Sequence, residues 1–76
     1  MGSAYLVNEF VRSQLKRIRL EKGLKLVEAA SQSGLAVSSY ACMESGFYKI
    51  NLDNLFRILG ALEAEISDVW PVETLT

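Results

Sequence analysis

The stretch Leu26–Glu44, LVEAASQSGLAVSSYACME, limits the fold of this chain most, because it is typical of two short helices joined at a tight corner. Gly34 can take the left-handed conformation that ends a helix, and Leu35 can fill the angle between the two helices. Helices joined by so short a glycine-containing turn cross steeply. The stretch therefore predicts a helix-turn-helix motif, with helices at Leu26–Ser33 and Val37–Ser45.

Apolar residues at helical spacing predict three more helices around this motif. We expect them at Tyr5–Glu21, Leu52–Glu63 and Ser67–Trp70, the last ended by Pro71. The first has a buried stripe made of Val7, Val11, Leu15 and Ile18, with Leu6 and Phe10 beside it. The fourth has a stripe made of Leu52, Leu55, Leu59 and Leu62, from which Phe56 and Ile58 are left over.

The helix ends give further expectations. Asn51 is a good N-cap for the fourth helix, whereas Lys25 is a poor one for the second. Gly60 lies inside the fourth helix, where glycine costs about 1 kcal/mol relative to alanine, so close approach by another helix would be a reason for it. Leu6 and Phe10 either belong to a longer core helix or meet a second subunit.

Length and composition bound the class of protein. A chain of 76 residues fits a single domain over 1–76, in which residues 1–3 are a candidate cloning remnant and 72–76 a tail. The single Cys42 cannot form an internal disulfide, and there is no histidine, no nucleotide-binding glycine motif and no metal-ligand pattern. We expect a cytoplasmic protein that is not an enzyme, with no cofactor, no metal, no small-molecule ligand and no membrane association.

The charge is divided unevenly along the chain. The net charge is −1, yet residues 1–25 carry six basic and two acidic side chains, whereas residues 26–76 carry two basic and seven acidic ones. A basic block on one helix is usually a solvated face. Charge alone therefore argues weakly against nucleic acid as a partner.

From Leu15 to Trp70 the order of residues resembles the phage-repressor and Cro-like class of helix-turn-helix domain, also called the XRE class. The resemblance rests on Arg19, Lys22-Gly23-Leu24, Ala30, Gly34, Leu35, Glu44, Gly46, Leu52, Leu55, Ala61, Leu62 and Ile66, all in register. It implies an all-α, compact five-helix helix-turn-helix domain of the phage-repressor type. It also implies a largely buried ion pair between Arg19 and Glu44.

The resemblance further implies where DNA would bind, with the helix at residues 37–45 in the major groove. Base-contacting positions fall on Ala36, Val37, Ser38, Ser39 and Cys42, and phosphate-contacting positions on Lys25, Leu26, Tyr48, Lys49 and Asn51. No base-contacting residue is Arg, Lys, Gln or Asn, so methyl contacts to thymine and single hydrogen bonds from serine remain. Leu26 replaces the glutamine frequent in the class, which leaves only its backbone N–H for a phosphate.

A homodimer is expected, since the fourth and fifth helices commonly form the dimer contact in the resembled class. Its residues would be Phe56, Ile58, Gly60, Val69 and Trp70, and the alternative is that Trp70 covers its own core. A two-fold pair would place its recognition helices about 34 Å apart and would read a palindromic double-stranded site.

Two functions follow. The first is a sequence-specific DNA-binding transcriptional regulator that acts as a homodimer. The alternative is a protein-interaction module, antagonist or antitoxin-like, that keeps the fold without binding DNA. The sparse recognition face and Leu26 favour the alternative; the basic first quarter and Lys49 favour the regulator.

Overall fold

The computed structural model describes the backbone of residues 2–70 and the side chains of residues 8–70. The described chain forms five helices: α1 (Gly2–Glu21), α2 (Leu26–Ser33), α3 (Val37–Ser45), α4 (Leu52–Leu62) and α5 (Ile66–Val69). The bounds of α2 and α3 are those predicted. The other three differ by one to three residues, and α1 includes Gly2 and Ser3. The expectations for Leu6, Val7, Pro71 and the tail at 72–76 fall outside the residues or side chains described.

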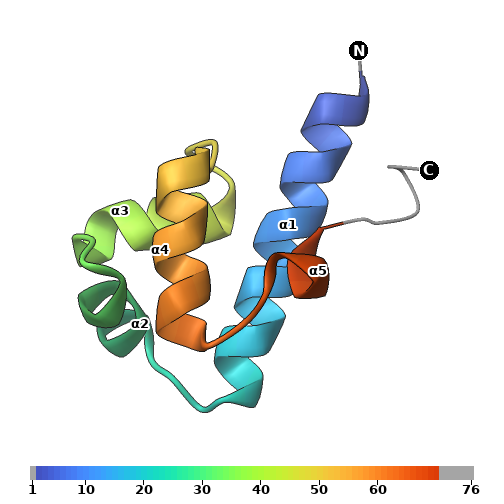
Figure 1. Ribbon diagram of the computed structural model, residues 1–76. Coiled ribbons are helices and arrows are strands. Elements are labelled where there is room, and N and C mark those ends of the chain that lie inside the picture. The colour runs from blue at the N-terminus through green and yellow to red at the C-terminus, as the bar shows by residue number, and fades with distance from the viewer. Residues whose placement is uncertain (1, 71–76) are drawn as a thin grey trace.

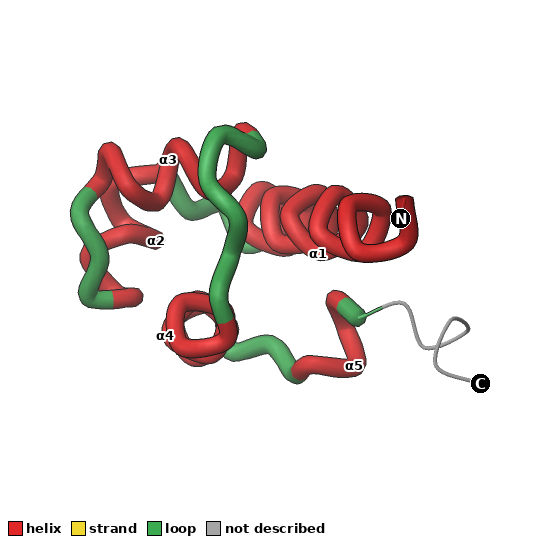
Figure 2. Tube along the Cα trace, turned by 90° about the horizontal axis from the view of Figure 1, so that it is seen from above, coloured by secondary structure: helices red, strands yellow, loops and turns green. Residues whose placement is uncertain are grey.

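Helix α4 packs against both α1 and α2. Seen from above, α4 is viewed along its axis, with α2 and α3 to one side and α1 and α5 to the other (Figure 2). The longest helix, α1, also packs against α3 and α5, and its N-terminal end points away from α2 (Figure 1). None of the helices within residues 2–70 is long and apolar enough to cross a membrane.

One hydrophobic core joins the five helices. It contains Val11, Leu15, Ile18, Ala29, Ala30, Tyr40, Met43, Leu55, Ile58, Leu59, Leu62 and Val69. The stripe predicted for α1 is confirmed at its three described members. In α4 the prediction was wrong at two positions, because Leu52 is 64% exposed and Ile58 is 2% exposed. Spacing could not separate these two, since each lies three or four residues from a member of the stripe.

The corner between α2 and α3 has the predicted geometry. Gly34 has φ +71° and lies in the left-handed region, which favours glycine. The Leu35 N–H donates to the Ala30 carbonyl at 2.9 Å, which closes the C-terminal end of α2. Leu35 packs against the core from this corner. The turn therefore fixes where α3 begins relative to α2.

Side chains close the N-terminal ends of α2 and α4 in different ways. The Asn51 Oδ1 accepts a hydrogen bond from the Asn54 N–H at 2.7 Å, so the predicted cap of α4 is confirmed. The Lys25 side chain makes no cap bond, as expected. However, the Glu28 carboxylate reaches back and accepts the Lys25 N–H at 2.8 Å. This half of a capping box compensates for the poor cap.

A buried ion pair joins α1 to α3. The Arg19 guanidinium donates to both Glu44 carboxylate oxygens at 2.8 Å, and a third bond runs from Arg19 Nη1 to the Leu24 carbonyl at 2.7 Å. The two side chains are only 8% and 9% exposed. Hydrogen bonding to Glu44 raises the pKa of Arg19, so the guanidinium stays charged. Because both charges are held away from water, removal of either residue would leave the other charge buried without a partner.

We predict that Glu44→Ala lowers the free energy of unfolding by about 3–5 kcal/mol, because it leaves the Arg19 charge buried without a partner. Urea unfolding followed by circular dichroism measures this. The matched control is Glu21→Ala, which breaks an exposed pair with Arg17 and should change stability by about 0–1 kcal/mol. Equal effects of the two substitutions would contradict a structural role for Glu44.

A second prediction concerns Tyr40, whose side chain is 2% exposed and whose hydroxyl has no hydrogen-bond partner among the described residues. Burial raises its pKa to about 12. The fold therefore favours the neutral phenol over the phenolate. The stability that depends on the neutral phenol is complete below about pH 10, the pKa of an unperturbed tyrosine, and is lost as the pH rises toward 12. Tyr40→Phe should be at least as stable as the wild type at pH 7 and should lose less stability between pH 9 and 11, whereas the exposed Tyr48→Phe should follow the wild type.

Candidate nucleic-acid interface

The outward face of α3 is open to solvent at its N-terminal end. Ala36, Val37 and Ser38 are exposed, and Ser39 and Cys42 are half-buried. On the inward face, Tyr40 and Met43 lie in the core. None of the five positions at which the resemblance places base contacts is fully buried. Residues 36–39 surround the first turn of α3, and Cys42 lies one turn further along, next to Ser38 and Ser39.

The chemistry of this face is sparse. The two serine hydroxyls can each donate or accept single hydrogen bonds, and the alanine and valine methyl groups can contact a thymine methyl. No side chain on the face can form the bidentate bonds by which arginine reads guanine or asparagine reads adenine. Small side chains do, however, let the backbone of α3 approach a groove closely.

The resemblance also places phosphate contacts at the N-terminal end of α2. Lys25 is exposed there, whereas the Leu26 side chain is half-buried and packs against the core. Only the backbone N–H of Leu26 is thus left for a phosphate. The Glu28 carboxylate, which accepts the Lys25 N–H, adds a negative charge at the same helix end. The contribution of this helix end to anion binding is correspondingly reduced.

The α3–α4 loop carries the remaining positions at which the resemblance places phosphate contacts. Gly46 begins the loop with φ +95°, in the left-handed region, and the exposed residues Phe47, Tyr48 and Lys49 follow it. Phe47 is 84% exposed. Asn51 is exposed, but its side-chain oxygen is already used to cap α4. The loop therefore offers one cation and two aromatic rings to a ligand.

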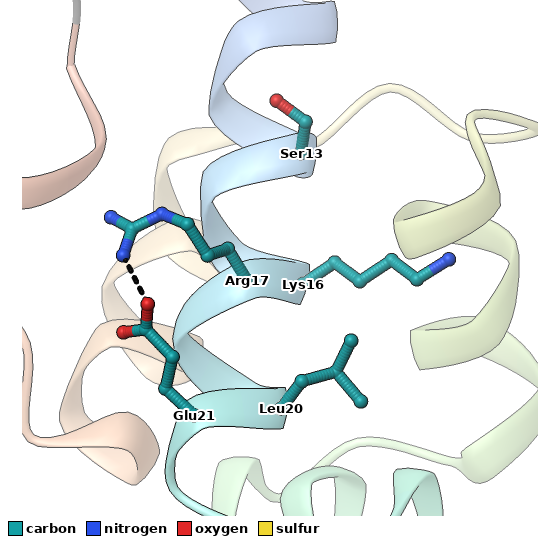
Figure 3. A pocket seen from close by; sticks show the side chains of 5 residues that line it. All are labelled: Ser13, Lys16, Arg17, Leu20 and Glu21. Atoms are coloured by element: carbon teal, nitrogen blue, oxygen red, sulfur yellow. Dashed lines mark hydrogen bonds and ion pairs between the residues drawn. The ribbon is translucent and has the colours of Figure 1, made fainter.

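Arginine and lysine have separate roles in this chain. Each arginine donates to a carboxylate of the same protomer: Arg12 to Glu9, Arg17 to Glu21, Arg19 to Glu44 and Arg57 to Asp53. Among residues 8–70, no lysine forms such a pair. Figure 3 shows this difference on α1, where Arg17 turns toward Glu21 and Lys16 extends away from both. The cations left for an external anion are thus Lys16, Lys22, Lys25 and Lys49.

The predicted dimer surface needs correction. Ile58 and Val69 are 2% and 0% exposed and belong to the core of one protomer, so they cannot meet a second copy of this fold. Trp70 is half-buried and packs against the same core. Phe56 is 58% exposed, and no neighbour among the described residues lies within 4 Å of where a Cβ of Gly60 would be. Close approach within this protomer therefore does not explain Gly60.

Sequence reasoning missed one contact at the end of α3. The Arg12 Nη1 donates to the Glu44 carbonyl at 3.1 Å, whereas from the sequence Arg12 is only one of the six basic side chains in residues 1–25. Arg12 and Arg19 are seven residues apart, which places them on the same face of α1 two turns from each other. That spacing was the available signal.

The comparisons agree with this geometry. A helix-turn-helix family model matches residues 15–69. The matched region includes all of α2, α3, α4 and α5 and the C-terminal third of α1, whereas residues 2–14 of α1 precede it. No curated protein and no solved structure matches the chain.

Proposed function

The chain belongs to the helix-turn-helix family of DNA-binding regulators, of the phage-repressor and Cro-like XRE type, and we propose that it binds a palindromic operator as a homodimer. The open, small-residue face of α3 is the observation that carries this proposal. Each protomer would place α3 in the major groove, with Ala36, Val37, Ser38, Ser39 and Cys42 toward the bases. Two copies related by a two-fold axis would read half-sites about 34 Å apart.

Phosphates would be held mainly by Lys25, at the N-terminal end of α2, and by Lys49, in the α3–α4 loop. Backbone N–H groups at Leu26 and near Asn51, and the Tyr48 hydroxyl, would supply uncharged hydrogen bonds. Because the arginines are all paired within the protomer, few cations remain to neutralise phosphates. Part of the specificity would then come from the shape and deformability of the operator rather than from base edges.

The dimer contact would lie along the exposed row Leu52, Phe56 and Gly60 of α4. These residues are spaced by four, so they follow one line along the helix. Leu52 and Phe56 are 64% and 58% exposed, and Gly60 would let a helix of the second copy come close. Half-buried Trp70 would border the contact.

No side chain on the α3 face can read a base bidentately. This favours a second candidate function, a protein-interaction module that pairs with a related repressor without binding DNA itself. A gel shift with the DNA that flanks the gene separates the two. A shifted band at low salt supports the regulator. No shift, together with co-purification of a related repressor, supports the module.

We predict a shallow salt dependence of DNA binding. Four lysines per dimer give a slope of log Kobs against log salt of about −4, and in any case no steeper than about −6. Lys49→Gln and Lys25→Gln should each reduce the slope by about 2 per dimer. Arg17→Gln is the control, because Arg17 is already paired with Glu21 on α1. An Arg17→Gln effect as large as the others would contradict the assigned phosphate contacts.

The Gly60→Ala variant tests the dimer surface. Alanine inside a helix is favoured over glycine by about 1 kcal/mol, and the site has room for the methyl group, so the isolated protomer should become more stable. The dimer should become weaker, because the methyl group would block the close approach. Urea unfolding at low protein concentration and sedimentation equilibrium measure these two effects.

The control for the dimer surface compares two side chains of nearly equal exposure. Phe56, on α4, is 58% exposed, and Leu20, in the shallow hollow on α1 drawn in Figure 3, is 57% exposed. Phe56→Ala should weaken the dimer, whereas Leu20→Ala should leave it unchanged. A dimer lost with Leu20→Ala and kept with Phe56→Ala would move the contact from α4 to α1.

A further inference from the structure

The helix that carries the candidate DNA-reading face has few local features of its own to stabilise it. Its N-cap residue, Ala36, makes no side-chain cap bond. The nine residues of α3 include no acid in the first turn and no basic residue in the last turn, and so lack favourable interactions with the helix dipole. Helices this short are marginal in isolation. The position and length of α3 therefore depend on contacts from the rest of the fold.

Two arginines of α1 supply those contacts, and both act on Glu44. Arg19 binds the Glu44 carboxylate with two hydrogen bonds of 2.8 Å. Arg12, two turns earlier on the same face, donates from Nη1 to the Glu44 backbone carbonyl at 3.1 Å. A cation at the C-terminal end of a helix also interacts favourably with the helix dipole. One arginine thus holds the side chain, and the other holds the main chain, of the same residue.

The carbonyl groups at the end of α3 show what Arg12 adds. The Cys42 carbonyl accepts the Phe47 N–H at 2.8 Å and the Tyr48 N–H at 3.1 Å, and the Met43 carbonyl accepts the Gly46 N–H at 3.4 Å. The Glu44 carbonyl receives its bond from Arg12 instead. Carbonyls of a final helical turn have no partner within the helix. Arg12 therefore completes the cap that the loop itself leaves unfinished.

The Arg12 side chain also lies directly against Gly46. A Cβ added at Gly46 would lie 2.9 Å from Arg12 Nε and 3.2 Å from Arg12 Cζ. Arg12 is held in place by an ion pair with Glu9 on the preceding turn of α1. Both Glu9 and Arg12 precede residues 15–69, the region that the family model matches. This contact is thus made by the N-terminal part of α1, ahead of the shared domain.

We propose that Arg12 is a positioning residue for DNA binding: it caps α3 at Glu44 and packs against Gly46, so that the α3 face and Lys49 meet one duplex together. The proposal rests on the proposed function for its ligand. Arg12 itself lies on the α1 side of α3 and pairs with Glu9, so its effect passes through the α3–α4 loop.

The experiment compares Arg12→Ala with Arg17→Ala. Both variants remove one arginine of α1 that is paired with a glutamate, so the change in charge is the same. Within residues 8–70, the Arg17 side chain bonds only to Gln14 and Glu21, both on α1. Binding to the flanking DNA is measured by fluorescence anisotropy at a temperature where circular dichroism shows each variant to be folded. We expect Arg12→Ala to weaken binding about tenfold or more and Arg17→Ala less than about threefold.

A double-mutant cycle with Lys49→Ala separates positioning from direct contact. If Arg12 acts through the loop, Arg12→Ala should weaken binding much less in the Lys49→Ala background than in the wild type. If the two losses are additive and Arg12→Ala lowers the salt slope in both backgrounds, Arg12 contacts phosphate itself and the proposal is wrong. Arg12→Lys keeps the charge but loses the planar guanidinium, so it should bind DNA between the wild type and Arg12→Ala.

Hydrogen exchange tests the cap without DNA. The Gly46, Phe47 and Tyr48 amides should exchange faster in Arg12→Ala than in the wild type, and Arg17→Ala should leave their exchange unchanged. If Arg12→Ala does not fold, the same faster exchange is expected in Arg12→Lys. Unchanged exchange overturns the proposal. A wild type that binds no DNA, with faster exchange in Arg12→Ala, would refute the proposed function and leave the cap in place. A wild type that binds, with Arg12→Ala equal to Arg17→Ala in affinity, would refute the positioning role alone.

Discussion

The rest of the structure depends on the ion pair between Arg19 and Glu44. Apolar contacts hold α3 against the other helices, but they are non-directional and would tolerate small shifts of a helix along its neighbours. A buried arginine with three hydrogen bonds to fixed acceptors does not tolerate them, because any shift leaves a charge without a partner. The pair therefore fixes the position of α3, a helix with no side-chain N-cap bond.

The pairing of arginines within the fold also determines which charged side chains remain for a ligand. The guanidinium group suits fixed, planar hydrogen bonding, and in this chain all four are paired with carboxylates of the same protomer. The lysines, which are flexible point charges, are left at the surface. A binding face supplied by lysines and small side chains can attract a polyanion, yet it has little means of reading base edges.

The exposed surfaces of α3 and α4 differ in chemistry, which agrees with the two tasks proposed for them: DNA binding for α3 and dimer formation for α4. The outward face of α3 offers small and hydroxyl side chains near lysines, whereas the outer row of α4 offers Leu52 and Phe56 with an open glycine. A duplex is bound by hydrogen bonds and cations, whereas the centre of a protein–protein contact is formed by apolar side chains. The N-terminal part of α1 is connected to the first of these surfaces through Arg12.

The sequence by itself determined the local features. Gly34, Asn51 and the apolar spacing of α1 specified the corner, a cap and a buried stripe, because each depends on residues a few positions apart. The family's residue pattern also placed Arg19 against Glu44. Only the tertiary structure decided that Ile58 and Val69 are buried while Leu52 is exposed, and that Arg12 reaches the end of α3. Those outcomes depend on which distant segment covers a given side chain. Helical spacing shows which residues share a face, as Arg12 and Arg19 do, but not what that face meets.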